Sequence, residues 1–525
     1  MKMTLSNGKV AIIGAGPSGL AAAKSALEEG LEPVLFEQIG HLGGQWNQGA
    51  PHSGVWAAMH TNTSAINTRF SDFPHKVGIS LFPHHQEILQ YLESYANHFN
   101  LLPYLRLHTR INNVARGPKG QYIVWSVNER QEQRAELFQH VIVASGRYNK
   151  PRYASLPGLA EFGGRVLHSF HYRNSADFAG QRVLVVGNSI SGLEIASELG
   201  QNPTVRVLSS CRKPRYILRK QLYGRPTDCV AFTRAAVYTS RALAPAQVAE
   251  DLKQVILSTC GNPADFGAPR PHESLLQAGI SMNDQYLDLA KQGRISARGG
   301  VAYFTADSVV FQDGQAEPID AVILATGFDV NLPFLSQDIR DTLQAGTDHI
   351  DLYHHTFHPC LPNLAFIGMF PQTGPYFPVV ELQARWITAC WSGARPLPGR
   401  EQMEAGLAEF RSFKQRRYET TLHEMATQLA ADAGVAPSLE RYPELARELL
   451  FGPLTPAQFR LEGHGALPGA LADYLQCLEQ IGSYAGLPLA EPQYQQLQQL
   501  LEALPQETTL HLLSKELETQ AEPAL

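Results

Sequence analysis

The stretch that decides the fold is KVAIIGAGPSGLAAAKSALEEGLEPVLFEQ, residues 9–38. An apolar run with β propensity comes first, and a glycine-rich turn follows it directly. An alanine-rich helix then extends as far as Gly30, and a second apolar run covers Pro33 to Phe36. This order of run, turn, helix and run predicts a βαβ unit.

The turn has the spacing of a dinucleotide site, Gly14-x-Gly16-x-x-Gly19, and Glu37 stands directly after the second run. The first glycine allows a tight turn, the second lets backbone approach a pyrophosphate, and the third lets the helix pack close to the sheet. The helix N-terminus then faces the anion, and the acid accepts hydrogen bonds from ribose hydroxyls. Because this acid disfavours a 2′-phosphate, the pattern predicts FAD or NAD here and not NADP.

A second unit repeats the same order in QRVLVVGNSISGLEIASELG, residues 181–200, followed by TVRVLSSCR, residues 204–212. Its turn, Gly187-x-Ser189-x-x-Gly192, carries serine at the middle position. Serine adds a small side chain where backbone should approach phosphate, although its hydroxyl can also donate to that phosphate. Two such units in one chain predict two nucleotide-binding folds.

The end of the second strand in this unit is basic and not acidic, since VLSSCRKPR presents Ser210, Arg212 and Lys213. Guanidinium and hydroxyl donors are what a 2′-phosphate requires. We therefore expect FAD at the first site and NADPH at the second. The alternative interpretation of the basic cluster is a solvated surface loop.

Composition and charge limit the function classes. The 525 residues correspond to roughly three domain-sized units. With 44% hydrophobic and 18% charged residues, the chain has the composition of a globular protein with a large core. The net charge of −6 offers no basic excess for phosphate neutralisation, so nucleic acid is not an expected partner.

The cysteines and the apolar runs indicate the compartment. The chain has six cysteines, and the closest two, Cys211 and Cys229, are too far apart for a CxxC redox or zinc motif. So few cysteines in so long a chain suit a reducing compartment. The first apolar run breaks into the glycine turn too early for a signal peptide, and no stretch reaches the length of a membrane span. These features predict a cytoplasmic protein that does not span a membrane.

Segments rich in glycine and proline suggest where the domains are divided. A Gly/Pro-rich segment at 144–164 precedes the second unit, and LATGFDVNLPFL, 324–335, is a plausible return crossing. The predicted fold class is α/β with two Rossmann-like dinucleotide-binding domains, for FAD and NADPH, an insertion in the second and a helical C-terminal region. The expected divisions are 1–155, first part of the FAD domain; 156–330, NADPH domain with an insertion at about 215–298; 331–450, second part of the FAD domain; and 451–525, C-terminal helical extension.

A further motif has a known counterpart. FGGRVLHSFHY contains Phe162-x-Gly164-x-x-x-His168-x-x-x-Tyr172, which resembles the FxGxxxHxxx(Y/F) signature of flavin-containing monooxygenases and related Baeyer–Villiger enzymes. Other segments are similar to this family from about residue 9 to residue 470: GGQW at 43–46, HTNTS at 60–64, SDFP at 71–74, FPHHQEILQYLESYANHF at 82–99, ATG at 325–327, LAFIG at 364–368, ELQARW at 381–386 and LLFGPLTPAQFRLEGHG at 449–465.

The resemblance implies an NADPH- and O2-dependent flavin monooxygenase. NADPH would reduce FAD, O2 would form a C4a-hydroperoxyflavin, and one oxygen would pass to a soft nucleophile such as an amine nitrogen or a sulfide. The family assigns Asn62 to a place beside the flavin and NADP+, and Arg212 to the 2′-phosphate. Further residues are carried over as cofactor-binding: Gly44, Gln45, Trp46, Thr61 and Thr326.

This sequence departs from the family in two places. The second loop reads GNSISG where many members have GxGxSG, and the hydrophobic C-terminal anchor of mammalian-type members is absent. The expected partners are a small-molecule substrate and O2, with no nucleic acid and no membrane, and a homodimer is left open.

Several alternatives remain at this stage. A Baeyer–Villiger enzyme acting on ketones shares the signature, and a non-catalytic redox-sensing flavoprotein shares the cofactor sites. A disulfide reductase is excluded, because no cysteine precedes Cys211. Histidines at 84–85, 354–355 and 358 lack a carboxylate or cysteine at ligand spacing, so no metal site is predicted. We expect His168 to support the linker and not to perform chemistry.

Overall fold

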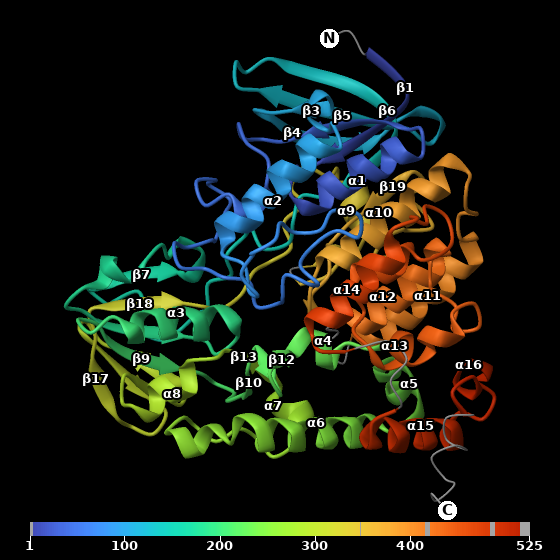
Figure 1. The fold of residues 1–525 in the computed structure, drawn as a ribbon. Coiled ribbons are helices and arrows are strands. Elements are labelled where there is room, and N and C mark those ends of the chain that lie inside the picture. Colours follow the sequence, from blue (N-terminus) through green and yellow to red (C-terminus); the bar gives the residue numbers. More distant parts are fainter. Residues whose placement is uncertain (1–3, 347, 415–419, 484–488, 515–525) are drawn as a thin grey trace, which may run out of the picture.

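The computed structural model describes residues 4–346, 348–414, 420–483 and 489–514. It has a mixed α/β fold with several parallel sheets (Figure 1). The first sheet lies at the top of Figure 1, the second at its left, and helices of the last third at its right. The expected α/β class is confirmed at this level.

The first sheet has the strand order β3-β2-β1-β6-β5-β4, and β19 pairs with β6. The β1, β2, β3, β6 and β19 pairings are parallel, and β4-β5-β6 is an antiparallel meander. The strands are β1 (Thr4–Ile13), β2 (Glu32–Phe36), β3 (Leu105–Arg106), β4 (Thr109–Arg116), β5 (Tyr122–Asn128), β6 (Gln133–Val143) and β19 (Leu364–Phe366).

Helices cover both faces of this sheet, because successive residues of β1 point to opposite faces and are apolar on each. Val10 and Ile12 of β1 pack into one core cluster with α1 (Pro17–Glu28), α2 (His85–His98) and α10 (Phe377–Ser392). Ala11 and Ile13 belong to a second cluster, which includes α9 (Gln337–Thr342).

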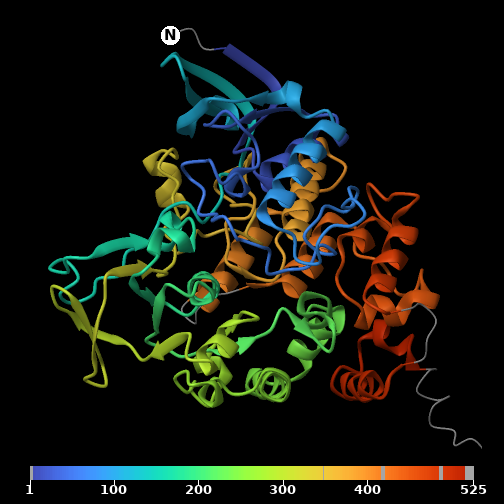
Figure 2. The ribbon, with the colours of Figure 1, turned by 60° about the vertical axis from the view of Figure 1, so that its left-hand side comes forward.

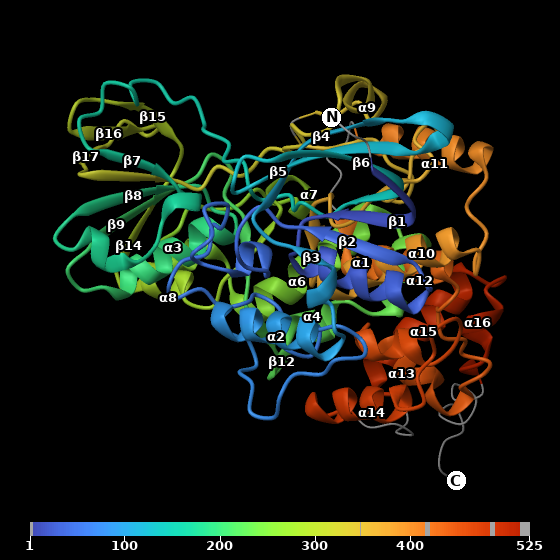
Figure 3. The same cartoon turned by 90° about the horizontal axis from the view of Figure 1, so that it is seen from above.

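The second sheet is fully parallel, in the order β14-β9-β8-β18-β7. Its strands are β7 (Arg165–His168), β8 (Arg182–Val186), β9 (Arg206–Ser210), β14 (Ile295–Arg298) and β18 (Ala321–Leu324). One face packs on α3 (Ile190–Gln201) and α8 (Tyr286–Lys291). The other packs on the antiparallel strands β15 (Val301–Phe304), β16 (Ser308–Phe311) and β17 (Ala316–Pro318), as seen from above in Figure 3.

The chain leaves the second sheet after β9 and rejoins it at β14. The residues expected to form an insertion thus end in a sheet strand, because Ile295–Arg298 pair with β9. The excursion lies between the second sheet and the C-terminal helices along the lower side of Figure 2. It contains β10 (Tyr216–Leu218), β11 (Gln221–Leu222), β12 (Arg225–Pro226), α4 (Thr227–Ala231), α5 (Arg234–Ala242), α6 (Pro245–Cys260), α7 (Leu275–Ala278) and β13 (Ile280–Met282).

Two connections between the sheets run side by side. The amide of Arg152 donates to the carbonyl of Gly327, and the amide of Asp329 donates to the carbonyl of Lys150, each at 2.9 Å. The Arg152 guanidinium also pairs with the Asp329 carboxylate at 2.6 Å. The two crossings are therefore held to each other as a short antiparallel pair.

The last third of the chain is mainly helical. Short strands β20 (Gln372–Thr373) and β21 (Thr420–Thr421) pair in parallel. The helices are α11 (Arg400–Lys414), α12 (Leu422–Ala433), α13 (Ala446–Phe451), α14 (Ala470–Gln480), α15 (Glu491–Ala503) and α16 (Thr508–His511). Within the described ranges, no helix combines the length and apolarity needed to cross a bilayer.

A buried cluster of charges fixes this helical part to the first nucleotide unit. The Arg460 guanidinium lies 3.0 Å from the Glu381 carboxylate on α10 and 3.2 Å from that of Asp72. Asp72 also pairs with Lys24 on α1. All four side chains are at most 8% exposed.

Candidate functional site

Two glycines of the first loop, Gly14 and Gly19, have no room for a side chain. Gly14 has φ +107°, and a Cβ there would lie 2.5 Å from the Ala144 carbonyl oxygen. A Cβ on Gly19 would lie only 1.8 Å from the carbonyl oxygen of Gly14. Helix α1 therefore begins directly against the turn, with Gly16 as its N-cap residue and Pro17 in its first turn. Its first amides point to the place where a phosphate would bind.

Glu37 is held in a defined orientation at the end of β2. Its Oε2 accepts a hydrogen bond from the Ala15 amide at 3.0 Å, and its Oε1 accepts one from the Ile39 amide at 3.2 Å. Its side chain is buried yet lines the cavity described below. Each carboxylate oxygen keeps a further lone pair, which a ribose hydroxyl can use.

The GGQW segment lies against this loop. The Gly43 amide donates to the Ala15 carbonyl at 2.9 Å, and a Cβ on Gly44 would lie 2.9 Å from the Cα of Gly16. Trp46 packs against the first core cluster, whereas Gln45 is exposed. The two glycine segments thus form one wall of backbone.

The second glycine loop repeats the geometry of the first. Gly187 has φ +122°, and a Cβ on Gly192 would lie 2.0 Å from the Gly187 carbonyl oxygen. Ser189 is extended at φ −83°, precedes α3, and makes no capping hydrogen bond with its side chain. Its hydroxyl therefore remains available to a ligand.

The basic segment after β9 lies beside the second loop. The Asn188 side-chain amide donates to the Lys213 carbonyl at 3.0 Å. Arg212 is exposed, and its guanidinium makes no hydrogen bond with the described part of the chain. The Ser210 hydroxyl donates to the Gly299 carbonyl at 2.6 Å, and Ser210 lines the cavity described below. The donor hydrogens at this position therefore come from Arg212 and Lys213.

Asn62 lies in a turn after an irregular segment. Its Oδ1 is buried and has no hydrogen-bond partner among the described residues. Thr61 is 4% exposed and donates through its hydroxyl to the Thr63 carbonyl at 2.7 Å. Thr326, at the second crossing, donates to the Arg152 carbonyl at 2.5 Å. A buried amide oxygen without a partner indicates a place where a bound group supplies the donor.

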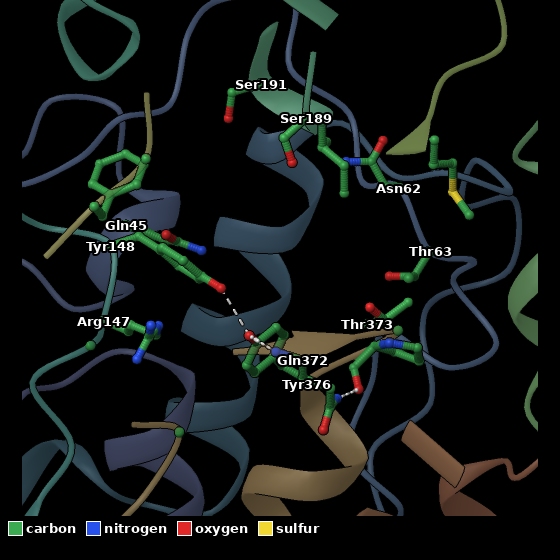
Figure 4. Close-up of a pocket in the computed structure, with 18 of the residues that line it drawn as sticks. Gln45, Asn62, Thr63, Arg147, Tyr148, Ser189, Ser191, Gln372, Thr373 and Tyr376 are labelled. Atoms are coloured by element: carbon green, nitrogen blue, oxygen red, sulfur yellow. Dashed lines mark hydrogen bonds between the residues drawn. The ribbon is translucent and has the colours of Figure 1, made fainter. Parts of the chain in front are cut away.

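One cavity of about 2900 Å³ connects these elements. Figure 4 shows Asn62 and Ser189 on one side of the pocket and Tyr148 and Tyr376 on another. Gly19 and Gly192 do not line it, because their role is the close packing of helix on turn. The other expected site residues all do: Gly14, Gly16, Glu37, Gly44, Gln45, Trp46, Thr61, Asn62, Gly187, Ser189, Ser210, Arg212 and Thr326.

The cavity also has lining residues that the sequence did not indicate. The hydroxyls of Tyr148 and Tyr376 are hydrogen-bonded to each other at 3.0 Å (Figure 4). The backbone amide of Gln372 donates to the Tyr376 hydroxyl at 2.8 Å. Asp228 of α4 and Gln496 of α15 line it as well. No motif or periodic pattern marks these positions, since they come together only in the folded chain.

Three of the histidines singled out in the sequence, His168, His354 and His358, have hydrogen-bond or ion-pair partners. Burial lowers the pKa of His168 to about 4, and its Nδ1 accepts a hydrogen bond from the Phe170 amide at 3.1 Å. His354 lies 2.6 Å from the Asp432 carboxylate, which is distant in sequence. Across the described residues, no three histidine, cysteine or acidic side chains come together as a metal site would require. Because its pKa is about 4, His168 is neutral near pH 7.

The chain is similar to known proteins over most of its length. The model of the flavin-binding monooxygenase-like family matches residues 7–483. Mouse flavin-containing monooxygenase 5 is 33% identical over 487 residues, which cover 88% of this chain and 90% of that protein. Rat dimethylaniline monooxygenase [N-oxide-forming] 2 is 33% identical over 488 residues, with the same coverage.

Solved structures with the same fold support the relationship. S-allyl-L-cysteine S-oxygenase from Allium sativum aligns with a TM-score of 0.56 and 21% identity, over 97% of this chain and 98% of that one. Cyclohexanone monooxygenase from Rhodococcus sp. Phi1, solved with NADP+, aligns with a TM-score of 0.62 and 18% identity, over 83% and 98%.

The fold and site define a flavin-binding monooxygenase, an oxidoreductase with two dinucleotide-type loops on one cavity. The chain belongs to the flavin-containing monooxygenase family. The expected family and enzyme class are thereby confirmed, and a non-catalytic redox module is set aside.

Proposed function

We propose that this enzyme binds FAD at the first glycine loop and NADPH at the second, and uses O2 to oxygenate amine nitrogen or sulfide sulfur. The observation that carries the proposal is the single cavity lined by both loops and by Asn62. A shared cavity allows a hydride donor and a flavin to meet without leaving the protein.

The residues fit these cofactors. Gly14 and Gly44 let backbone segments pack where a Cβ would collide with Ala144 or Gly16, and Glu37 is oriented for ribose. The basic segment at Arg212 supplies donors for a 2′-phosphate. When bound, the flavin takes electrons from NADPH and activates O2, which is chemistry the side chains do not provide.

The protein's own contribution is positioning. Asn62 has a free amide oxygen at the cavity, and a carboxamide accepts and donates hydrogen bonds without titrating. His168 does not line this cavity, and it is buried and neutral near pH 7, so it delivers no proton there. Such a site favours oxygen transfer over wasteful release of hydrogen peroxide.

Oxygen uptake tests the proposal directly. Protein loaded with FAD should consume O2 and NADPH faster when a tertiary amine or a thioether is added. Product analysis by mass spectrometry should show one added oxygen atom. Ketones in the same panel test the Baeyer–Villiger alternative, which a lactone or ester product would establish. No added oxygen in any compound class would refute monooxygenase activity toward these substrates.

A further inference from the structure

The segment that carries Asn62 is tied to the rest of the protein by few contacts of its own. The Thr61 amide donates to the Pro83 carbonyl at 2.9 Å, and the Ala65 amide donates to the Leu81 carbonyl at 2.8 Å. These bonds fix the backbone, but they leave the far side of the turn to be held by another element. That element comes from the excursion between β9 and β14.

Asp228, in α4, makes this contact with one carboxylate oxygen. Its Oδ2 accepts hydrogen bonds from the Ser64 amide at 3.1 Å, the Ser64 hydroxyl at 2.8 Å and the Asn67 side-chain amide at 3.1 Å. The partners are more than 160 residues away in sequence. Asp228 is 2% exposed and pairs with no cation in the described part of the chain.

Burial of an acid without a cation is costly, and burial raises the pKa of the Asp228 carboxyl. The hydrogen bonds from Ser64 and Asn67 act in the opposite direction. A leucine or valine would fill such a position at lower cost if packing were the only need. The acid is instead matched to three donors on one short turn.

A second contact from the same excursion holds the other end of the turn. The Lys220 ammonium donates to the Thr61 carbonyl at 3.4 Å and lies 3.3 Å from the Glu194 carboxylate on α3. Helix α3 begins at the second glycine loop. Lys220 thereby connects the expected NADPH loop to the residue directly before Asn62.

We infer that Asp228 is a positioning residue for Asn62: it fixes the turn at Ser64 and Asn67 so that the Asn62 amide stays directed into the cavity. The inference rests on the proposed function for the role of Asn62. The position of the turn itself is measurable without turnover.

Hydrogen exchange provides that measurement. In Asp228→Ala, the Ser64 amide loses its acceptor, and its exchange should become roughly tenfold faster. Asp228→Asn keeps an oxygen at the position of Oδ2 and should restore most of the protection. The matched control is Asp351→Ala, which removes a fully buried acid outside the cavity and should leave exchange at Ser64 unchanged.

Coupling provides the second readout. Hydrogen peroxide released per NADPH should rise several-fold in Asp228→Ala, fall back toward the wild-type value in Asp228→Asn, and stay at the wild-type value in Asp351→Ala. Should Asp228→Ala not fold, Ser64→Ala removes one of the three donors and should give a smaller change in the same direction.

The outcomes distinguish failure of the positioning role of Asp228 from failure of the proposed monooxygenase function. Wild-type exchange and coupling in Asp228→Ala, or in Ser64→Ala if the first does not fold, would overturn the inference. Faster exchange at Ser64 with unchanged coupling would also overturn it, because Asp228 would then be structural only. A wild-type protein that oxygenates nothing refutes the proposed function instead, and the exchange result still reports on the turn.

Discussion

Arg460 and Glu381 form an ion pair of 3.0 Å with both side chains almost fully buried. Glu381 lies on α10, and its other oxygen accepts the Ser71 amide at 2.8 Å. Arg460 comes from a segment far along the chain and completes the charge cluster that includes Lys24 on the helix of the first glycine loop. The last third of the chain therefore supports the FAD-type loop directly.

Removing Arg460 should destabilise the protein and weaken FAD binding together. Arg460→Met leaves Glu381 and Asp72 buried with less compensation, which costs about 3–5 kcal/mol. Thermal unfolding and FAD fluorescence measure the two effects. The exposed pair Arg400–Glu404 is the control, since Arg400→Met should change neither. Unchanged stability in Arg460→Met would contradict the role given to the cluster.

The purified protein should be yellow, with one non-covalent FAD per chain. Gly19→Ala should abolish FAD binding, because its Cβ would lie 1.8 Å from the Gly14 carbonyl oxygen. Gly399→Ala meets nothing within 4 Å and serves as the control. The ratio of flavin to protein absorbance reports the result, and a Gly19→Ala protein with full flavin content would show that FAD binds elsewhere.

NADPH should be preferred over NADH through Arg212. Arg212→Ala should raise the KM for NADPH by roughly ten- to a hundredfold, as loss of hydrogen bonds to a charged group does, and leave NADH almost unaffected. Arg206→Ala removes an exposed arginine at the opposite end of β9, which pairs with Glu317, and should change neither KM. Equal losses with both cofactors would make Arg212 a structural residue.

Asn62→Ala should uncouple the enzyme. FAD should stay bound and its reduction by NADPH should largely persist, because neither glycine loop changes. Product should fall and hydrogen peroxide per NADPH should rise, since the free amide oxygen at the cavity is lost. Asn97→Ala, on the exposed surface of α2, is the control. A variant that loses stability but stays fully coupled would place Asn62 among turn-capping residues.

His168 should make the protein acid-sensitive. Burial lowers its pKa from 6.5 to about 4, so the unfolded chain binds the proton more readily between these values. Stability from this group is complete above pH 6.5 and falls as the pH drops toward 4, by up to about 3 kcal/mol. His168→Gln should flatten the curve of thermal midpoint against pH in this window, and a curve as steep as wild type would contradict the assignment. His41→Gln, at an exposed site, should not.

The local parts of this structure could be predicted from the sequence. Both glycine turns and their flanking strands and helices follow from short patterns with a defined geometry. The placements of Asp228, Tyr376 and Gln496 at the cavity could not be predicted, because each depends on contacts with residues far away in sequence. The same holds for the contact of Lys220 with Thr61. The Ser210 hydroxyl donates to the Gly299 carbonyl, a contact with a residue distant in sequence that the local pattern does not reveal.

The strand β19 has a consequence for how the chain folds during synthesis. The second sheet is complete once residue 324 has been made, since all its strands lie between Arg165 and Leu324. The first sheet begins at Thr4, and β6 can pair with β1 and β5 early. Its third partner, β19, is missing until Leu364–Phe366 have been made. Closing so long a loop slows folding because its entropy must be lost before the contacts form. We therefore expect the second sheet to be completed first during synthesis. The first sheet is completed later, when β19 pairs with β6.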